Sequence, residues 1–248
     1  MIWRVLAAVG LAGTLTVNYL ANALPIAGRT TAEISDRLFT LVTPAGFTFA
    51  VWGLIYLALA VYVVYQLMPE RRGDATLTAV APWFVFTCVC NSLWLVAWHS
   101  GALGWSVALM LGLLAALIQI YRIVSRRPAM DADYWALSAP FSLYLGWIIV
   151  ATLVNVSAAL VGLGIRAEGV WAVLWAVLLI AVAAGVGLMF LDVQADRVLA
   201  LVLVWALLGI AVRQWGVDGV VAAAITAIAV LVISMIRRDR PEGRQARS

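Results

Sequence analysis

The sequence predicts an all-α fold, a polytopic transmembrane bundle of eight helices. Of its 248 residues, 65% are hydrophobic and only 11% are charged, and the mean hydropathy is +1.04. A soluble globular protein carries about 25% charged residues, so this composition excludes a water-soluble domain. Apolar runs of about 20 residues, the length that crosses a bilayer, recur along the chain.

The predicted helices follow these apolar runs in order. They cover residues 3–24, 47–68, 79–98, 103–124, 137–161, 170–191, 197–212 and 218–236. The first run is followed by Pro25 and not by a small-residue cleavage site, so we interpret it as a spanning helix and not as a signal peptide. The seventh is short and is followed by Arg213, so seven crossings is the alternative.

Arginines predict the orientation of these helices. Twelve fall on one side of the predicted membrane, namely Arg4, Arg71, Arg72, Arg122, Arg126, Arg127, Arg197, Arg237, Arg238, Arg240, Arg244 and Arg247. Four fall on the other side: Arg29, Arg37, Arg166 and Arg213. Because basic loops stay in the cytoplasm, we expect a multi-pass protein of the plasma (inner) membrane with both termini cytoplasmic. The basic tail, residues 237–248, favours contact with the lipid bilayer and not with nucleic acid.

The longest predicted connection is the first outer loop, from Pro25 to Pro44. It contains Thr30-Thr-Ala-Glu33, which fits the capping box that begins a helix. We expect a short helix over about residues 31–39 across the outer mouth of the bundle. Its charged residues fit either a gate or a solvated face.

Three helix faces combine aromatic side chains with amides or small residues. At helical spacing these faces comprise Phe49, Trp52 and Tyr56; Asn91, Trp94 and Trp98; and Trp147, Ala151 and Asn155. An unpaired amide is costly in hydrocarbon, so these faces are expected to turn inward. They could enclose an aromatic, weakly polar cleft, or they could serve only helix packing.

Side-chain catalysis is not expected from this sequence. Its acidic residues fall in predicted loops or at helix ends, and it has no cluster of His, Cys and carboxylates with metal-ligand spacing. No phosphate-binding glycine loop and no Ser, His and Asp set at a common depth are present either. We therefore expect no metal site and no required cofactor.

Three blocks of sequence resemble the TspO/MBR family, the tryptophan-rich sensory proteins related to the peripheral benzodiazepine receptor. Residues 43–56 (TPAGFTFAVWGLIY) resemble the start of the family's second helix. Residues 90–94 (CNSLW) resemble its Leu-Asn-x-x-Trp in the third helix, and residues 140–155 (PFSLYLGWIIVATLVN) resemble its Pro-Tyr-x-x-Trp, Ala-Thr and Leu-Asn run in the fifth. Ala45 stands where the family has a second Pro, and three further helices follow the five, as in a divergent, extended branch.

The resemblance implies a five-helix bundle, often dimeric, that binds porphyrins or other hydrophobic ligands such as sterols under its first loop. It divides the chain into a TspO-like bundle over 1–162, additional transmembrane helices over 163–236 and a cytoplasmic tail over 237–248. Small residues in the additional helices, such as Ala181, Gly185 and Gly187, suit close packing within the chain or in a homodimer. The residues implied to line the ligand cavity are Trp52, Tyr56, Asn91, Trp94, Trp147, Ala151 and Asn155.

These expectations leave three functions open. The first is a sensory, regulatory or tetrapyrrole-handling protein that binds a flat hydrophobic ligand. The ligand would stack on Trp52 and Trp147 and hydrogen-bond with Asn91 and Asn155. The second is passive transport of a hydrophobic small molecule, and the third is a membrane enzyme that degrades porphyrin.

Overall fold

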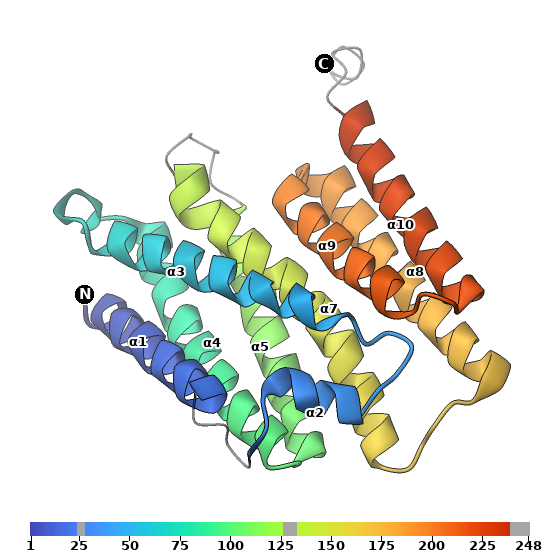
Figure 1. Cartoon of the computed structure of the whole chain (residues 1–248). Helices are drawn as coiled ribbons and strands as arrows, with labels where there is room; N and C mark the ends of the chain where they lie inside the picture. The colour runs from blue at the N-terminus through green and yellow to red at the C-terminus, as the bar shows by residue number, and fades with distance from the viewer. Residues whose placement is uncertain (24–27, 126–132, 239–248) are drawn as a thin grey trace.

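The computed structural model describes residues 1–23, 28–125 and 133–238, and the regular elements within these ranges are helical (Figure 1). The long helices are α1 (Ile2–Ala23), α3 (Val51–Leu67), α4 (Ala75–His99), α5 (Leu103–Val124), α7 (Ala139–Gly162), α8 (Gly169–Gln194), α9 (Arg197–Arg213) and α10 (Asp218–Arg237). The shorter elements are α2 (Thr31–Arg37), the 3-10 turns η2 (Gly46–Ala50) and η3 (Pro69–Arg71), and the π-helical turn η4 (Tyr134–Ser138). The predicted basic tail lies, beyond Arg238, outside the described residues.

The predicted class, a polytopic helical membrane bundle, is confirmed. Seven candidate spans are long and apolar enough to cross a membrane within the described part of the chain. They are α1, η2 with α3, α4, α5, η4 with α7, α8 and α10. The seventh predicted helix, α9, is formed but is not among these candidate spans, since it has 17 residues, about 26 Å at the α-helical rise. The sequence predicted that this helix is short. Its length affects two features described below, namely the contacts at its C-terminal end and the space between α7 and α8.

Several helix ends differ from the prediction because capping and turn chemistry extend them. Helix α4 begins at Ala75 and not at residue 79, since the Asp74 side chain accepts a hydrogen bond from the Leu77 amide at 3.1 Å. The fifth span gains the π-helical turn η4 ahead of α7. Helix α8 continues to Gln194, where Ala195 adopts a left-handed conformation (φ 53°) and ends it.

The long helices form two groups (Figure 1). In the first group, α4 packs on α1 and α5, and α7 packs on α5 and α3. In the second group, α8, α9 and α10 pack on one another. Helix α9 joins the groups because it packs extensively on α7, whereas α7 and α8 barely touch.

An aromatic cluster holds the first group together away from α2. Tyr62, Phe84 and Phe141 come from α3, α4 and α7 and are fully buried. Their ring centroids lie 4.8–5.9 Å apart in edge-to-face geometry, an arrangement that aromatic rings favour. This cluster therefore acts as core packing.

The start of α1 and the end of α10 lie away from α2, at the other end of the bundle (Figure 1). The buried Arg4 guanidinium donates to the Arg71 carbonyl at 2.6 Å, and Arg71 forms an ion pair with Asp133 at 2.9 Å. At the end of α10, Arg238 pairs with Asp192 near the end of α8 at 2.5 Å.

Candidate functional site

Aromatic side chains from η2, α3 and α7 gather at the end of the bundle nearest α2. The Trp52 ring stacks on Tyr56 with centroids 5.4 Å apart, and it meets Trp147 edge-on at 6.3 Å. Phe49, from η2, meets the other side of Trp147 at 5.8 Å. The chain therefore brings two of its predicted aromatic faces into direct contact.

The third predicted face joins this group through a hydrogen bond between α4 and α7. The Trp94 indole N–H donates to the Asn155 carbonyl oxygen at 3.0 Å, and the Asn155 amide donates to Ser106 Oγ of α5 at 2.9 Å. All three residues are buried, so this chain of hydrogen bonds satisfies the Asn155 side chain within the protein. Asn155 thus fixes the Trp94 ring beside the aromatic group.

Asn91 lies deeper and connects α1, α4 and α7. Its amide donates to the Tyr144 hydroxyl at 3.0 Å, and its carbonyl oxygen accepts from the Asn18 amide at 3.1 Å. Tyr144 in turn meets the Trp52 ring at 5.9 Å. Sequence reasoning did not select Asn18, Ser106 or Tyr144, although an amide within a predicted spanning helix is a signal that could have singled out Asn18.

A cavity of about 40 Å³ lies between these aromatic rings and α2. Of the seven residues predicted to line a ligand site, five face it: Trp52, Trp94, Trp147, Ala151 and Asn155. Tyr56 and Asn91 are not among its lining residues and form the layer behind it. Its other lining residues are Thr31, Ser35, Pro44, Phe49, Trp98, Val150 and Val154.

Trp147 contributes a buried indole N–H that is left unused. Its side chain is 2% exposed, yet its Nε1–H donates to no hydrogen-bond acceptor among residues 1–23, 28–125 and 133–238. By contrast, Trp94 donates to Asn155, and the Trp98 N–H donates to the Thr31 carbonyl of α2 at 3.3 Å. A buried donor without an acceptor costs about 1–3 kcal/mol. The Trp147 N–H lies in the wall of the cavity, so an acceptor on a bound molecule would remove that cost.

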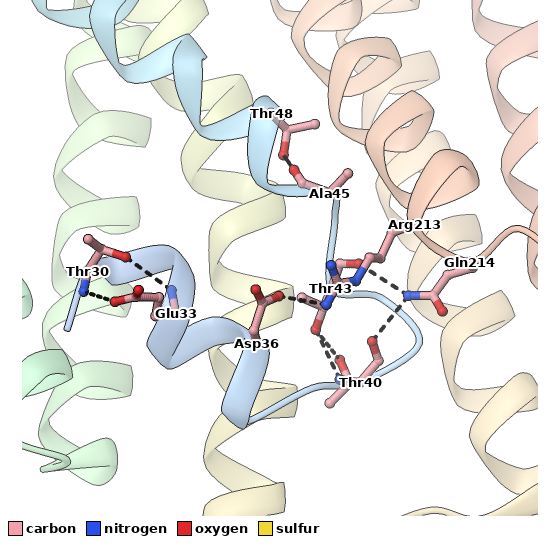
Figure 2. A network of polar contacts seen from close by, with 9 residues as sticks. All are labelled: Thr30, Glu33, Asp36, Thr40, Thr43, Ala45, Thr48, Arg213 and Gln214. Atoms are coloured by element: carbon pink, nitrogen blue, oxygen red, sulfur yellow. Dashed lines mark hydrogen bonds and ion pairs between the residues drawn. The ribbon is translucent and has the colours of Figure 1, made fainter.

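The predicted capping box forms and begins α2 (Figure 2). The Thr30 amide donates to Glu33 Oε2 at 2.7 Å, and the Glu33 amide donates to Thr30 Oγ1 at 3.3 Å. These hydrogen bonds, with Arg29 and Arg37 nearby, lower the pKa of Glu33. Since Thr31 and Ser35 line the cavity, α2 covers its outer side, as expected from the sequence.

The segment between α2 and α3 is attached to the end of α9 (Figure 2). Arg213 forms an ion pair with Asp36 at 2.8 Å, and the Gln214 amide donates to the Thr43 carbonyl at 3.2 Å. The Gln214 amide also lies 3.4 Å from the Thr40 carbonyl. The additional helices therefore hold the cover of the cavity in place, a role that no motif in the sequence indicated.

A second attachment lies where η2 crosses α9. The Ala45 amide donates to the Gly209 carbonyl at 3.0 Å, and the Trp205 indole donates to the Thr48 carbonyl at 3.1 Å. A Cβ atom at Gly209 would lie 2.0 Å from Thr48 Cγ2, so only glycine permits this approach. Helix α9 thus positions η2, which carries Phe49 into the cavity wall.

In the described ranges, no group of three or more His, Cys, Asp or Glu side chains is placed to hold a metal ion. The site is instead mainly apolar and aromatic, with indole, amide and hydroxyl groups as its polar elements. Such a lining suits binding of an apolar molecule by stacking and by one or two hydrogen bonds.

Comparison with known proteins gives one match. A family model described as TSPO-like protein matches residues 4–237. The match continues past residue 162, the expected end of the five-helix bundle, and includes α8, α9 and α10. No curated protein and no solved structure matches the chain significantly. Because the family model spans almost the whole sequence, the chain belongs to the family of TSPO-like proteins.

Proposed function

We propose that this membrane protein binds a flat hydrophobic small molecule that carries a hydrogen-bond acceptor. The molecule binds in the aromatic cavity beneath α2. The observation that carries the proposal is the unpartnered Trp147 N–H in the wall of that cavity. Burying a donor without an acceptor destabilises the fold, and a bound acceptor removes that cost.

The indole and amide groups of the lining favour an acceptor on the ligand. The side-chain carbonyls of Asn91 and Asn155 already accept hydrogen bonds from Asn18 and Trp94. The Trp147 N–H remains, and an indole N–H can only donate. Tetrapyrroles and sterols both place oxygen acceptors on a flat apolar frame, and both fit this requirement.

Binding of such a ligand requires the cavity to widen. Small-molecule sites typically measure about 300–1,000 Å³, whereas this cavity measures about 40 Å³. The covering helix α2 has seven residues and two buried side chains, Ile34 and Ser35, so its displacement exposes little apolar surface. We therefore assign the role of lid to α2 and its flanking loop.

A lid whose position depends on the ligand suits a sensory or regulatory protein. Displacement of α2 changes the contacts that Arg213 and Gln214 make with it and with residues 38–44. Ligand binding would in this way change the contacts of α9 and affect the helices packed on it. A role in tetrapyrrole handling uses the same cavity and the same lid.

Two substitutions test the site. Trp147→Phe removes the N–H and keeps an aromatic ring, and it should weaken binding about 5-fold, the value of one neutral hydrogen bond of about 1 kcal/mol. Trp52→Ala removes a large apolar contact and should weaken binding about tenfold to thousandfold. Binding of protoporphyrin and of a sterol is measured by equilibrium separation of bound ligand, because tryptophan quenching would change with each variant.

Trp105→Phe is the matched control, since Trp105 is 72% exposed and lies outside the cavity lining. It should bind both ligands as the unaltered protein does. If Trp147→Phe and Trp52→Ala fold normally and also bind both ligands unchanged, the aromatic group serves only helix packing and the proposed site is wrong.

A further inference from the structure

A second and much larger cavity, of about 890 Å³, lies between the last turns of α7 and the first half of α8. The loop after α2 and the start of α10 complete its wall. Its lining residues are Phe39, Thr40, Leu41, Ser157, Leu160, Val161, residues 165–169, Trp171, Ala172, Val173, Leu174, Trp175, Leu178 and Val217. It shares no lining residue with the aromatic cavity, and we refer to it as the α7–α8 groove.

The groove exists because α9 is short. Helix α8 has 26 residues, about 39 Å, whereas α9 has 17, about 26 Å. Helix α9 packs against both α7 and α8 and so separates them, but it ends at Arg213, before the first turns of α8 are covered. In Figure 1 the facing ends of α7 and α8 diverge below α9 and are joined by their connecting segment. A hydrogen bond of 3.1 Å from Trp175 to Ser157 bridges the two helices inside the groove.

The wall of the groove is apolar and open to its surroundings. Two of its lining residues from α8, Leu174 and Leu178, are 50% and 52% exposed. Both flanking helices are long and apolar enough to span a membrane, so the groove opens toward lipid and not toward water. A space of this size within the hydrocarbon layer is filled by membrane-dissolved molecules.

The rim of the groove carries two opposite charges. Arg166 and Glu168 line it from the α7–α8 connection, and both are exposed. Neither side chain forms an ion pair or a hydrogen bond within residues 1–23, 28–125 and 133–238. Trp171, 71% exposed, lies in the first turn of α8 and also lines the groove.

This combination matches a headgroup that contains a phosphate and an ammonium. A guanidinium binds phosphate oxygens in bidentate fashion, and a carboxylate pairs with an ammonium. An indole face adds a cation–π contact to the same ammonium. A headgroup with a phosphate alone would leave Glu168 facing a like charge.

We propose that the α7–α8 groove is a binding site for one zwitterionic phospholipid. Its acyl chain lies between α7 and α8, its phosphate contacts Arg166, and its ammonium contacts Glu168 and Trp171. This site is separate from the aromatic cavity and does not depend on the function proposed above.

The test uses the full chain in detergent, equilibrated with equal amounts of phosphatidylethanolamine and phosphatidylglycerol and then freed of loosely bound lipid. Native mass spectrometry counts the lipids that remain. The unaltered protein should retain phosphatidylethanolamine several-fold more than phosphatidylglycerol. Arg166→Gln should lower retention of both lipids, because both carry the phosphate. Glu168→Gln should remove the preference by raising retention of phosphatidylglycerol.

Two controls separate the groove from general surface lipid. Arg122→Gln removes an exposed arginine at the other end of the bundle and should leave retention unchanged. Leu174→Trp fills the groove and should lower retention of both lipids, whereas Leu208→Trp, at a 44% exposed α9 position outside the groove lining, should not. Equal retention of the two lipids by the unaltered protein, or an unchanged preference in Glu168→Gln, would overturn the proposal. Both rim residues are exposed, so their substitution leaves the fold intact.

Discussion

At the scale of single residues, Asn91 stabilises the bundle by joining three helices. Its side chain donates to Tyr144 and accepts from Asn18, and it is 1% exposed. We therefore predict that Asn91→Leu lowers the free energy of unfolding by about 1–3 kcal/mol, because the Asn18 amide and the Tyr144 hydroxyl each lose that partner. The midpoint of thermal unfolding in detergent measures the change.

A double-mutant cycle with Tyr144→Phe shows whether the hydrogen bond itself is responsible. Tyr144→Phe removes the acceptor and keeps the ring beside Trp52. If the two residues act as a pair, the double variant should be less destabilised than the sum of the single variants. Additive effects would indicate that the bond to Tyr144 contributes little, and that the loss in Asn91→Leu comes from its other contacts, such as the one with Asn18.

Glu33 makes the start of α2 sensitive to acid. Its pKa is lowered from the ordinary value of 4.5, first by hydrogen bonds to Thr30 and then by Arg29 and Arg37. A group whose pKa is lower in the folded state stabilises the fold above its unfolded pKa, and this contribution is lost as the pH falls through the folded pKa. The capping box should therefore protect α2 above about pH 4.5 and weaken below it.

Hydrogen exchange of the α2 amides, compared with the same segment in Glu33→Gln, measures this dependence. The unaltered protein should lose protection of α2 as the pH falls below 4.5, after correction for intrinsic exchange rates. Glu33→Gln keeps an acceptor for the Thr30 amide but has no group that titrates there, so its protection should be lower at neutral pH and should not change with pH. Equal protection in both proteins at neutral pH would show that the Glu33 carboxylate does not stabilise the lid.

At the scale of helices, α9 and η2 meet at a position that only glycine permits. A Cβ atom at Gly209 would approach Thr48 Cγ2 to 2.0 Å and Pro44 Cβ to 3.3 Å. We predict that Gly209→Ala displaces η2 and lowers the free energy of unfolding by about 1–3 kcal/mol, the usual cost of overpacking. Hydrogen exchange of residues 45–51 should rise with it.

Gly185→Ala provides the matched control in α8. A Cβ atom at Gly185 meets nothing within 4 Å, so the change should be neutral or slightly stabilising, since alanine favours the helix by up to about 1 kcal/mol. If both variants unfold at the same temperature, the contact between η2 and α9 contributes little to the position of the lid.

At the scale of the whole molecule, α9 connects the two sites. Its C-terminal end holds the lid through Arg213 and Gln214, and its shortness leaves the α7–α8 groove uncovered. Phe39 contacts both regions. It lines the groove, and its ring centroid lies 5.6 Å from the guanidinium carbon of Arg213, which holds the lid. The additional helices that follow residue 162 thus shape the cover of the aromatic cavity.

The orientation of the whole chain remains a prediction. The start of α1 and the end of α10 lie at the same end of the bundle, and the arginine distribution predicts that this end is cytoplasmic. A reporter fused after Ser248 that is active only outside the cytoplasm should remain silent, and the same reporter inserted between Arg166 and Glu168 should be active. The opposite pattern would reverse the orientation, and two silent reporters would show that α8 begins on the cytoplasmic side.

Hydropathy determined the helices because the thickness of the hydrocarbon layer fixes their length and composition. Local chemistry determined α2, since the capping box between Thr30 and Glu33 lies within four residues of sequence. Helical spacing also determined which faces turn inward, and five of the seven predicted site residues line one cavity. The shortness of α9 could be read from its apolar run and the arginine that follows it.

Only the tertiary structure decided which partners the inward-facing polar groups use. The amides of Asn91 and Asn155 could have faced a ligand, but rotation and depth of the neighbouring helices bring Asn18, Tyr144, Trp94 and Ser106 within reach instead. That choice leaves the Trp147 N–H as a free donor in the cavity wall. The attachment of the lid to α9 joins residues more than 150 positions apart, and the groove arises from a difference in length between packed helices. Spacing along one helix contains no information about such contacts, because they depend on how separate helices pack.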